Sequence, residues 1–364
     1  MEKTLTKRQA VILFALLTIA LKLQRLPAIM STEFSRDTYI AFACLFLFDF
    51  LILLIILSVY RKLDGLTIFE YIEKNIGKVA LIIFCVLTII FFMFKALLAF
   101  KQLHEFFANT LFNRLPWNVF SILFIALLIL MVGNGLKNIG RSGEFYLYLM
   151  VFSLLTIVVL GVFVGDYQRL LPILDIDIPE KLPKLFKYLG WFLDPVVILF
   201  FAGNVKEEKV STKSFIWTHI VCGVFVVFGM ATFYAINEYM VEFQSNGLTS
   251  MTEFTLIRLG VGRPDWFLVL FVNIANVIVT AFLVWVVTKS LVSIFNKRVT
   301  YAFSAITLTV VYLLDEFVYK NLEQTVLITT RYASVFMVGY AVIIPLVILL
   351  IRSKKHQMEG VAYE

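Results

Sequence analysis

The segment VILFALLTIALKLQRLPAIM, residues 11–30, decides the fold class, because it starts as a membrane-spanning helix and then breaks off. Residues 11–21 are almost entirely apolar, and Lys22, Gln24 and Arg25 follow before Pro27. Proline lacks a backbone donor and clashes with the preceding turn, so we predict an interruption near residues 22–27. Pro27 is then expected to open a second half-helix, a position that proline favours.

A second segment, YLGWFLDPVVILFF at residues 188–201, shows the same pattern, since Asp194-Pro195 interrupts an apolar run. Interrupted helices at matching positions of two halves indicate a transporter-type binding site near the middle of the membrane. Two ordinary proline kinks are the alternative, because such kinks are common in spanning helices. These residues alone favour neither interpretation.

Hydrophobic segments cover most of the 364 residues. A run of roughly 18 apolar residues can already cross a bilayer. The sequence therefore predicts one polytopic all-α integral membrane domain over residues 1–364. We expect about ten transmembrane spans, near residues 9–34 (interrupted), 38–60, 79–100, 116–133, 143–165, 186–204, 212–236, 266–295, 299–314 and 332–351.

Composition supports this class, with 61% hydrophobic and 16% charged residues against roughly a quarter charged in soluble domains. The net charge of +7 therefore does not indicate a nucleic-acid partner. Lys and Arg concentrate in cytoplasmic loops. The basic chain ends and the Lys297-Arg298 turn predict that both termini are cytoplasmic.

Several chemical functions are not expected. The three histidines and three cysteines lack metal-ligand spacing. The glycines at residues 133–140 lack the spacing of a phosphate loop. No nucleophile–base set is visible either. We therefore expect no metal, no cofactor and no enzyme activity.

Two connections have distinct patterns. Residues 67–78 place Ile68, Phe69 and Ile72 at helical spacing, which predicts a short helix on the inner membrane surface. Residues 166–187 hold three prolines among charged residues, which predicts a capping loop and no helix.

The charges inside the spans require partners, since an unpaired charge there costs roughly 2.5–3.5 kcal/mol. The helical rise per residue places Lys22, counted from the inner membrane face, and Asp194, counted from the outer face, at comparable depth in the membrane. We expect Lys22, or else Arg25, to neutralise Asp194, with Asp49 as the competing partner. Holding helices together and gating or binding a ligand are equally compatible roles for this pair.

Other polar residues complete the candidate set. Thr18, Lys22 and Arg25 share one helical face by spacing. Asn273 and Asn276 are three positions apart, and their spacing favours hydrogen bonds between helices, with ligand binding as the alternative role. Lys95 is expected to snorkel outward, without a function. The predicted ligand-binding or gating residues are Thr18, Lys22, Gln24, Arg25, Asp194, Pro195, Asn273 and Asn276.

Over residues 5–295 the chain resembles the spore germination permease family, the B subunits of nutrient germinant receptors, within the amino acid–polyamine–organocation transporter superfamily. No single sequence motif is specific to this family, but the order and spacing of all the matching motifs together are specific to it. The matching pieces are TKRQ (6–9), LP (26–27), RD (36–37), TIFE (67–70), GK (77–78), EFF (105–107), LP (115–116), Arg141 with Glu144, LLP (170–172) and Arg263 with Asp265.

The resemblance implies a LeuT-like fold of two inverted five-helix repeats, about 9–165 and 186–351, with helices one and six broken. A small nutrient ligand, often an amino acid, would bind between segments one, three, six and eight. The implied partners are a soluble-domain A-type subunit, a lipoprotein C-type subunit and the lipid bilayer. The implied location is the inner membrane of a spore.

The chain departs from the family in the expected pocket. Residues 20–23 read ALKL where glycines are usual, and Asp194-Pro195 stands where a small residue or a glutamate is usual. A lysine there could take the place of a coupling cation, or could fill the site of a scaffold that transports nothing. A germinant receptor subunit is the leading hypothesis, with an amino-acid permease and a membrane scaffold or channel component as rivals.

Overall fold

A computed structural model describes residues 5–107, 117–172, 178–205, 210–237, 251–253, 265–296, 299–318 and 327–351. The first half of the chain forms the following helices: α1 (Lys7–Ala20), α2 (Leu26–Phe34), η1 (Ser35–Asp37), α3 (Thr38–Lys62), α4 (Ile68–Asn75), α5 (Lys78–Phe106), α6 (Trp117–Gly133) and α7 (Leu136–Val164).

The second half continues with short elements and long helices. They are η3 (Tyr167–Leu170), α8 (Ile178–Leu185), η4 (Phe186–Trp191), η5 (Asp194–Val197), α9 (Ile198–Phe201), α10 (Thr212–Asn237), α12 (Asp265–Phe295), α13 (Thr300–Phe317), η7 (Ile328–Ala333) and α15 (Ser334–Leu350).

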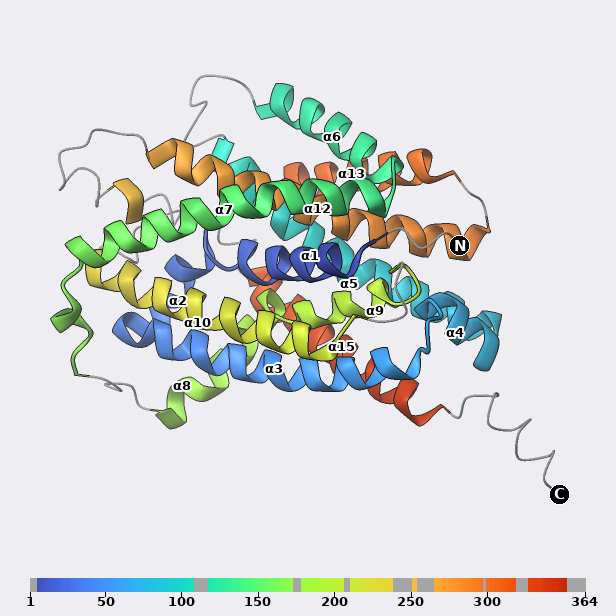
Figure 1. Cartoon of the computed structure of the whole chain (residues 1–364), viewed down its shortest axis with the longest axis horizontal. Helices are drawn as coiled ribbons and strands as arrows, with labels where there is room; N and C mark the ends of the chain where they lie inside the picture. Colours follow the sequence, from blue (N-terminus) through green and yellow to red (C-terminus); the bar gives the residue numbers. More distant parts are fainter. Residues whose placement is uncertain are drawn as a thin grey trace.

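The long helices run roughly along one common direction (Figure 1). Helix α1 packs against α7, α10 and α12, and α12 packs most extensively against α5. The two broken segments, α1–α2 and η4–η5–α9, therefore lie inside the bundle, while α6 lies at one edge (Figure 1). This arrangement places the interruptions where lipid does not reach them.

Six helical stretches are long and apolar enough to cross a membrane: residues Leu26–Lys62, Lys78–Phe106, Leu136–Val164, Thr212–Asn237, Val269–Phe295 and Ile328–Leu350. Large apolar side chains on these helices remain exposed, among them Phe163 at 79% and Val335 at 75%. Such a surface requires lipid around it, so the chain is a multi-pass membrane protein. The relation of its halves as inverted repeats stays a prediction.

Two expectations about the connections have different outcomes. The short helix predicted within residues 67–78 is confirmed as α4, which begins with a capping box between Thr67 and Glu70. The loop predicted over residues 166–187 is wrong in part, because α8 occupies Ile178–Leu185. Pro179 lies in its first turn, where proline is tolerated because no intrahelical N–H donor is needed.

One end of the bundle collects several connections. Leu5 donates its N–H to the carbonyl of Asn204 at 3.0 Å. At the same end, Lys62 donates to the carbonyls of Ile348 (3.0 Å) and Leu349 (2.6 Å) in the last turn of α15 and to that of Ile351 (2.5 Å), which follows it. The start of α1 and the end of α15 therefore lie on one side, as Figure 1 shows.

Candidate functional site

The first interruption lies where the sequence predicts it. Helix α1 starts with a capping box between Thr6 and Gln9 and ends at Ala20. Residues 21–25 are not helical, and α2 begins at Leu26 with Pro27 in its first turn. Both the interruption and the position of Pro27 are confirmed.

The second interruption is built around a strained residue. Leu193 has φ +65° between η4 and η5, in the left-handed region that non-glycine residues rarely occupy. Asp49 of α3 accepts the N–H of Leu193 at 2.8 Å. Such strain persists only where neighbouring contacts impose it. The carbonyls of the two preceding residues, Trp191 and Phe192, accept hydrogen bonds from Lys95 of α5.

Three buried charges meet between the interruptions. Lys22 forms an ion pair with Oδ2 of Asp194, and Lys95 pairs with Oδ1 of the same carboxylate at 2.9 Å. Lys22 is 0% exposed, and Lys95 and Asp194 are each 2% exposed. The predicted pair of Lys22 with Asp194 is therefore present, and a second lysine joins it.

The expectation for Lys95 is wrong. Its Nζ does not reach the outer surface but donates to the carbonyls of Trp191 (3.2 Å) and Phe192. Helix α5 continues to Phe106, so Lys95 lies about 16 Å below its end by helical rise. The span expected to end at residue 100 is too short, because polar residues of α5 are buried against other helices.

The residues expected as alternatives to the pair of Lys22 with Asp194 have other partners. Arg25 pairs with Glu105 of α5. Asp49 holds the backbone of Leu193, and its Oδ2 has no hydrogen-bond partner among the described residues. The shared face expected for Thr18, Lys22 and Arg25 does not extend past Ala20, because the backbone there is no longer helical. Thr18 instead offers its carbonyl oxygen to Lys22 Nζ at 2.8 Å.

Amide side chains line the first interruption. Gln24 donates to Oδ1 of Asn273 on α12 at 2.8 Å, which is the expected bridge between helices. Gln102 of α5 donates to the carbonyl of Leu21 at 3.0 Å. Both amide atoms of Asn276 and the side-chain oxygens of Gln24 and Gln102 are buried without a hydrogen-bond partner in the described part of the chain.

The residues missed from the sequence lie on one helix. Lys95, Gln102 and Glu105 are seven and three positions apart along α5, a spacing that places them on one face. That face contacts Asp194, Leu21 and Arg25. The spacing of these three residues therefore indicates a shared polar face, but only if the third span is extended past residue 100.

A separate ionic cluster joins α5 to α13. The buried Asp315 lies 3.2 Å from Nζ of Lys101 and 2.5 Å from Nδ1 of His104. These ion pairs connect the C-terminal part of α5 to α13 in the second half of the chain. No group of three or more His, Cys, Asp or Glu side chains able to hold a metal occurs among the described residues.

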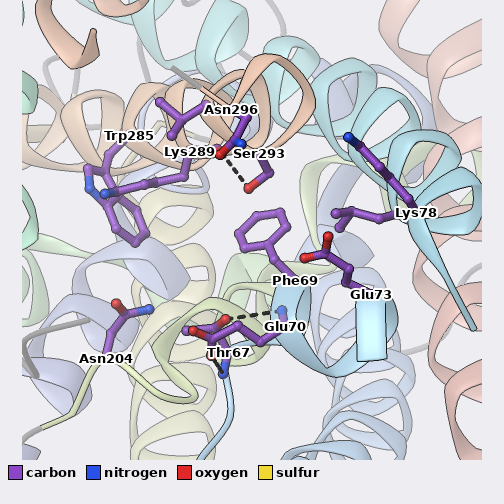
Figure 2. Close-up of a pocket in the computed structure, with 12 residues that line it drawn as sticks. Thr67, Phe69, Glu70, Glu73, Lys78, Asn204, Trp285, Lys289, Ser293 and Asn296 are labelled. Atoms are coloured by element: carbon purple, nitrogen blue, oxygen red, sulfur yellow. Dashed lines mark hydrogen bonds between the residues drawn. The ribbon is translucent and has the colours of Figure 1, made fainter. Parts of the chain in front are cut away.

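A polar cavity of about 230 Å³ opens at the end of the bundle that holds α4 (Figure 2). Helix α4 contributes Glu70 and Glu73, and α12 contributes Trp285 and Lys289, as Figure 2 shows. Asn204, which follows the second broken segment, also lines it. Trp285 lies nine positions after Asn276 on α12, so about 13 Å separates the cavity from the central amides along the helix.

Comparison with known proteins agrees with this architecture. A profile described as "Spore germination protein" matches residues 4–324. Spore germination protein A2 of Bacillus subtilis (strain 168) is 26% identical over 168 residues, which are 46% of this chain and 46% of that protein. The alignment therefore spans about half the length of that relative.

Two solved structures share the fold. A manganese transporter of Eremococcus coleocola, in complex with an aromatic bis-isothiourea substituted compound, gives a TM-score of 0.62 at 12% identity, covering 93% of this chain and 78% of the transporter chain. A mutant of that transporter gives 0.58 at 11% identity, with the same coverage of 93% and 78%. At these identities the likeness concerns the fold alone. The family resemblance drawn from residues 5–295 is confirmed, and the chain belongs to the spore germination protein family.

Proposed function

We propose that this chain is the membrane subunit of a nutrient germinant receptor, which binds a small nutrient between α1–α2, α5, η5–α9 and α12. The observation that most directly supports this proposal is the set of buried amide atoms without hydrogen-bond partners on Gln24, Gln102 and Asn276. Buried polar atoms without partners are costly, and a ligand with an ammonium and a carboxylate group could satisfy both donors and acceptors. An amino acid is therefore the proposed ligand class.

The residues around the interruptions divide into three roles. Gln24, Gln102, Asn273 and Asn276 would contact the ligand. Lys22 and Asp194, positioned by Thr18 and Pro195, would form the gate, because their ion pair joins the two broken segments. Arg25, paired with Glu105, would hold the outer half of the first segment. A few kcal/mol of differential affinity between two states is enough to shift such an equilibrium.

Membership of the family supports the assembly that we propose. The partners are an A-type subunit with a soluble domain and a lipoprotein C-type subunit, and the location is the inner membrane of a spore. The start of α1 and the end of α15 lie on one side of the bundle, which is compatible with two cytoplasmic termini. Ligand binding would change the arrangement of the broken segments and signal through these partners.

An amino-acid permease is the second candidate. The transporter fold supports it, as does the polar cavity at the α4 end (Figure 2), which could serve as an exit toward one side of the membrane. Uptake of radiolabelled amino acids into proteoliposomes separates the two. Saturable uptake above that of empty liposomes would support the permease and contradict a receptor that only senses.

The receptor is tested in spores that lack this chain, screened against single amino acids. We expect loss of the response to one nutrient, restored by the wild-type chain but not by Asn276→Leu. Asn237→Leu is the matched control, because Asn237 is also a buried amide with an unpartnered oxygen, but it lies at the end of α10. An undiminished response with Asn276→Leu, or equal loss with both variants at normal protein levels, would contradict the proposed site.

A further inference from the structure

The ammonium group of Lys95 has the surroundings of a bound cation. Its Nζ contacts the carbonyl oxygens of Trp191 (3.2 Å) and Phe192 and Oδ1 of Asp194 (2.9 Å). Carbonyl and carboxylate oxygens are the ligands that hard inorganic cations select. Backbone carbonyls at broken helices supply such ligands in membrane transporters.

Lys22 occupies the matching position at the first interruption. Its Nζ contacts the carbonyl of Thr18 at 2.8 Å, in the last turn of α1, and Oδ2 of Asp194. It also lies 4.8 Å from the ring centroid of Phe192, within the range of cation–π attraction. The carboxyl-terminal ends of α1 and η4, which carry partial negative charge, therefore each face a lysine.

Two basic and two acidic groups are buried together. They are Lys22 and Lys95 with Asp49 and Asp194, and all four side chains are at most 2% exposed. An additional cation would add positive charge beside the two lysines in a region of low dielectric constant, which is strongly unfavourable. Both carboxylate oxygens of Asp194 are already occupied by lysines.

We propose that Lys95 and Lys22 take the place of an exchangeable cation, so that this protein binds no inorganic cation between its broken helices. Manganese, the cargo of the transporters with a similar fold, does not fit this centre, because the oxygen ligands are taken by the protein's own ammonium groups. The inference holds whether the protein senses or transports its ligand. The converse also follows: removal of one lysine charge leaves an oxygen-lined site in which two acidic groups face a single basic group.

The test measures the thermal unfolding of purified protein in detergent at constant ionic strength, in choline, sodium or potassium chloride and with added manganese chloride. The wild type should have the same Tm in all four. Lys95→Met should unfold at a lower temperature in choline and regain about 5 °C at saturating concentration of at least one inorganic cation. Met is uncharged and similarly flexible, so the variant removes mainly the charge.

The double variant Lys95→Met/Asp194→Asn is the matched control, because it again leaves one basic group, Lys22, with one acidic group, Asp49, and removes the carboxylate that would bind the cation. Its Tm should not depend on the cation. Lys22→Met is the second single variant, with the same expected dependence as Lys95→Met. Cation-dependent stability of the wild type would overturn the proposal, as would single variants that respond to no cation or that fail to fold in every salt.

Discussion

At the residue scale, Asp194 is the group on which the centre depends most, because it accepts from two buried lysines. Asp194→Asn should lower the free energy of unfolding by about 3–5 kcal/mol, the range for removing one partner from a buried ion pair. Thermal and denaturant unfolding in detergent measure this loss. The cause would be two ammonium groups left with a weaker partner.

Asp166→Asn is the control for that experiment. Asp166 pairs with Arg169 at 3.2 Å, but the two side chains are 51% and 29% exposed. An exposed pair of this kind contributes less than about 1 kcal/mol. If both variants lost equal stability, the buried carboxylate would not hold the two broken segments together.

The same residues show how much of the centre the sequence predicts. Depth along two segments predicted a pair of Lys22 with Asp194, with Arg25 and Asp49 as alternative partners, because helical rise converts sequence number into height. The burial of Lys95 does not follow from its position in the sequence, since a lysine near an expected helix end can reach the surface. The partners of Arg25 and Asp49 depend on how the backbone turns after Ala20 and at Leu193, which composition and spacing do not specify.

At the element scale, the junction of α9 with α4 depends on Gly203. This residue has φ +72°, and a Cβ there would lie 2.5 Å from the backbone nitrogen of Thr67. Gly203→Ala should therefore both strain the backbone and separate α9 from the first turn of α4. We expect a loss of more than about 2 kcal/mol, measured by thermal unfolding, because left-handed conformation alone costs about 1–2 kcal/mol.

Gly65→Ala separates the two effects. Gly65 has φ +80°, with nothing within 4 Å of the added Cβ, so only the conformational cost applies. The difference between the variants reports the close approach of α9 to α4. Equal losses of unfolding free energy in the two variants would mean that α9 and α4 can separate slightly without destabilising the protein.

The long helices were predicted within a few residues where apolar runs end in polar turns, as for α3, α6 and α10. Helix α5 was underestimated, because its last turns carry Lys101, Gln102 and His104. Those side chains are largely buried against Asp315 and Leu21. The polar residues at the end of α5 therefore indicate a contact with other parts of the protein, and they do not indicate that the helix has reached the membrane surface. Helix α8 was not predicted, because the three prolines of residues 166–187 were interpreted as evidence for a loop.

At the scale of the whole molecule, the membrane class and the two broken segments follow from the sequence, while the inverted repeat stays a prediction. Hydropathy counts residues in a run and cannot relate one half of the chain to the other. The half-helices α1, α2 and α9 are each shorter than a span. Their neighbours hold them at membrane depth: α7, α10 and α12 pack against α1, and α3 packs against α2 and α9.

The arrangement of the two ends can be tested by cysteine accessibility. Glu73 on α4 and Gln168 on η3 are both exposed and lie at opposite ends of the bundle, because α7 runs from the α1 start to η3. In a background with Cys44, Cys85 and Cys222 replaced, Gln168→Cys should react with a membrane-impermeant thiol reagent applied to intact cells. Glu73→Cys should react only in inverted vesicles. Denatured protein gives the total labelling for each variant. Reaction of both cysteines from one side would contradict a bundle that spans the membrane with α4 on the cytoplasmic face, and exchange of the two sides would reverse the proposed orientation.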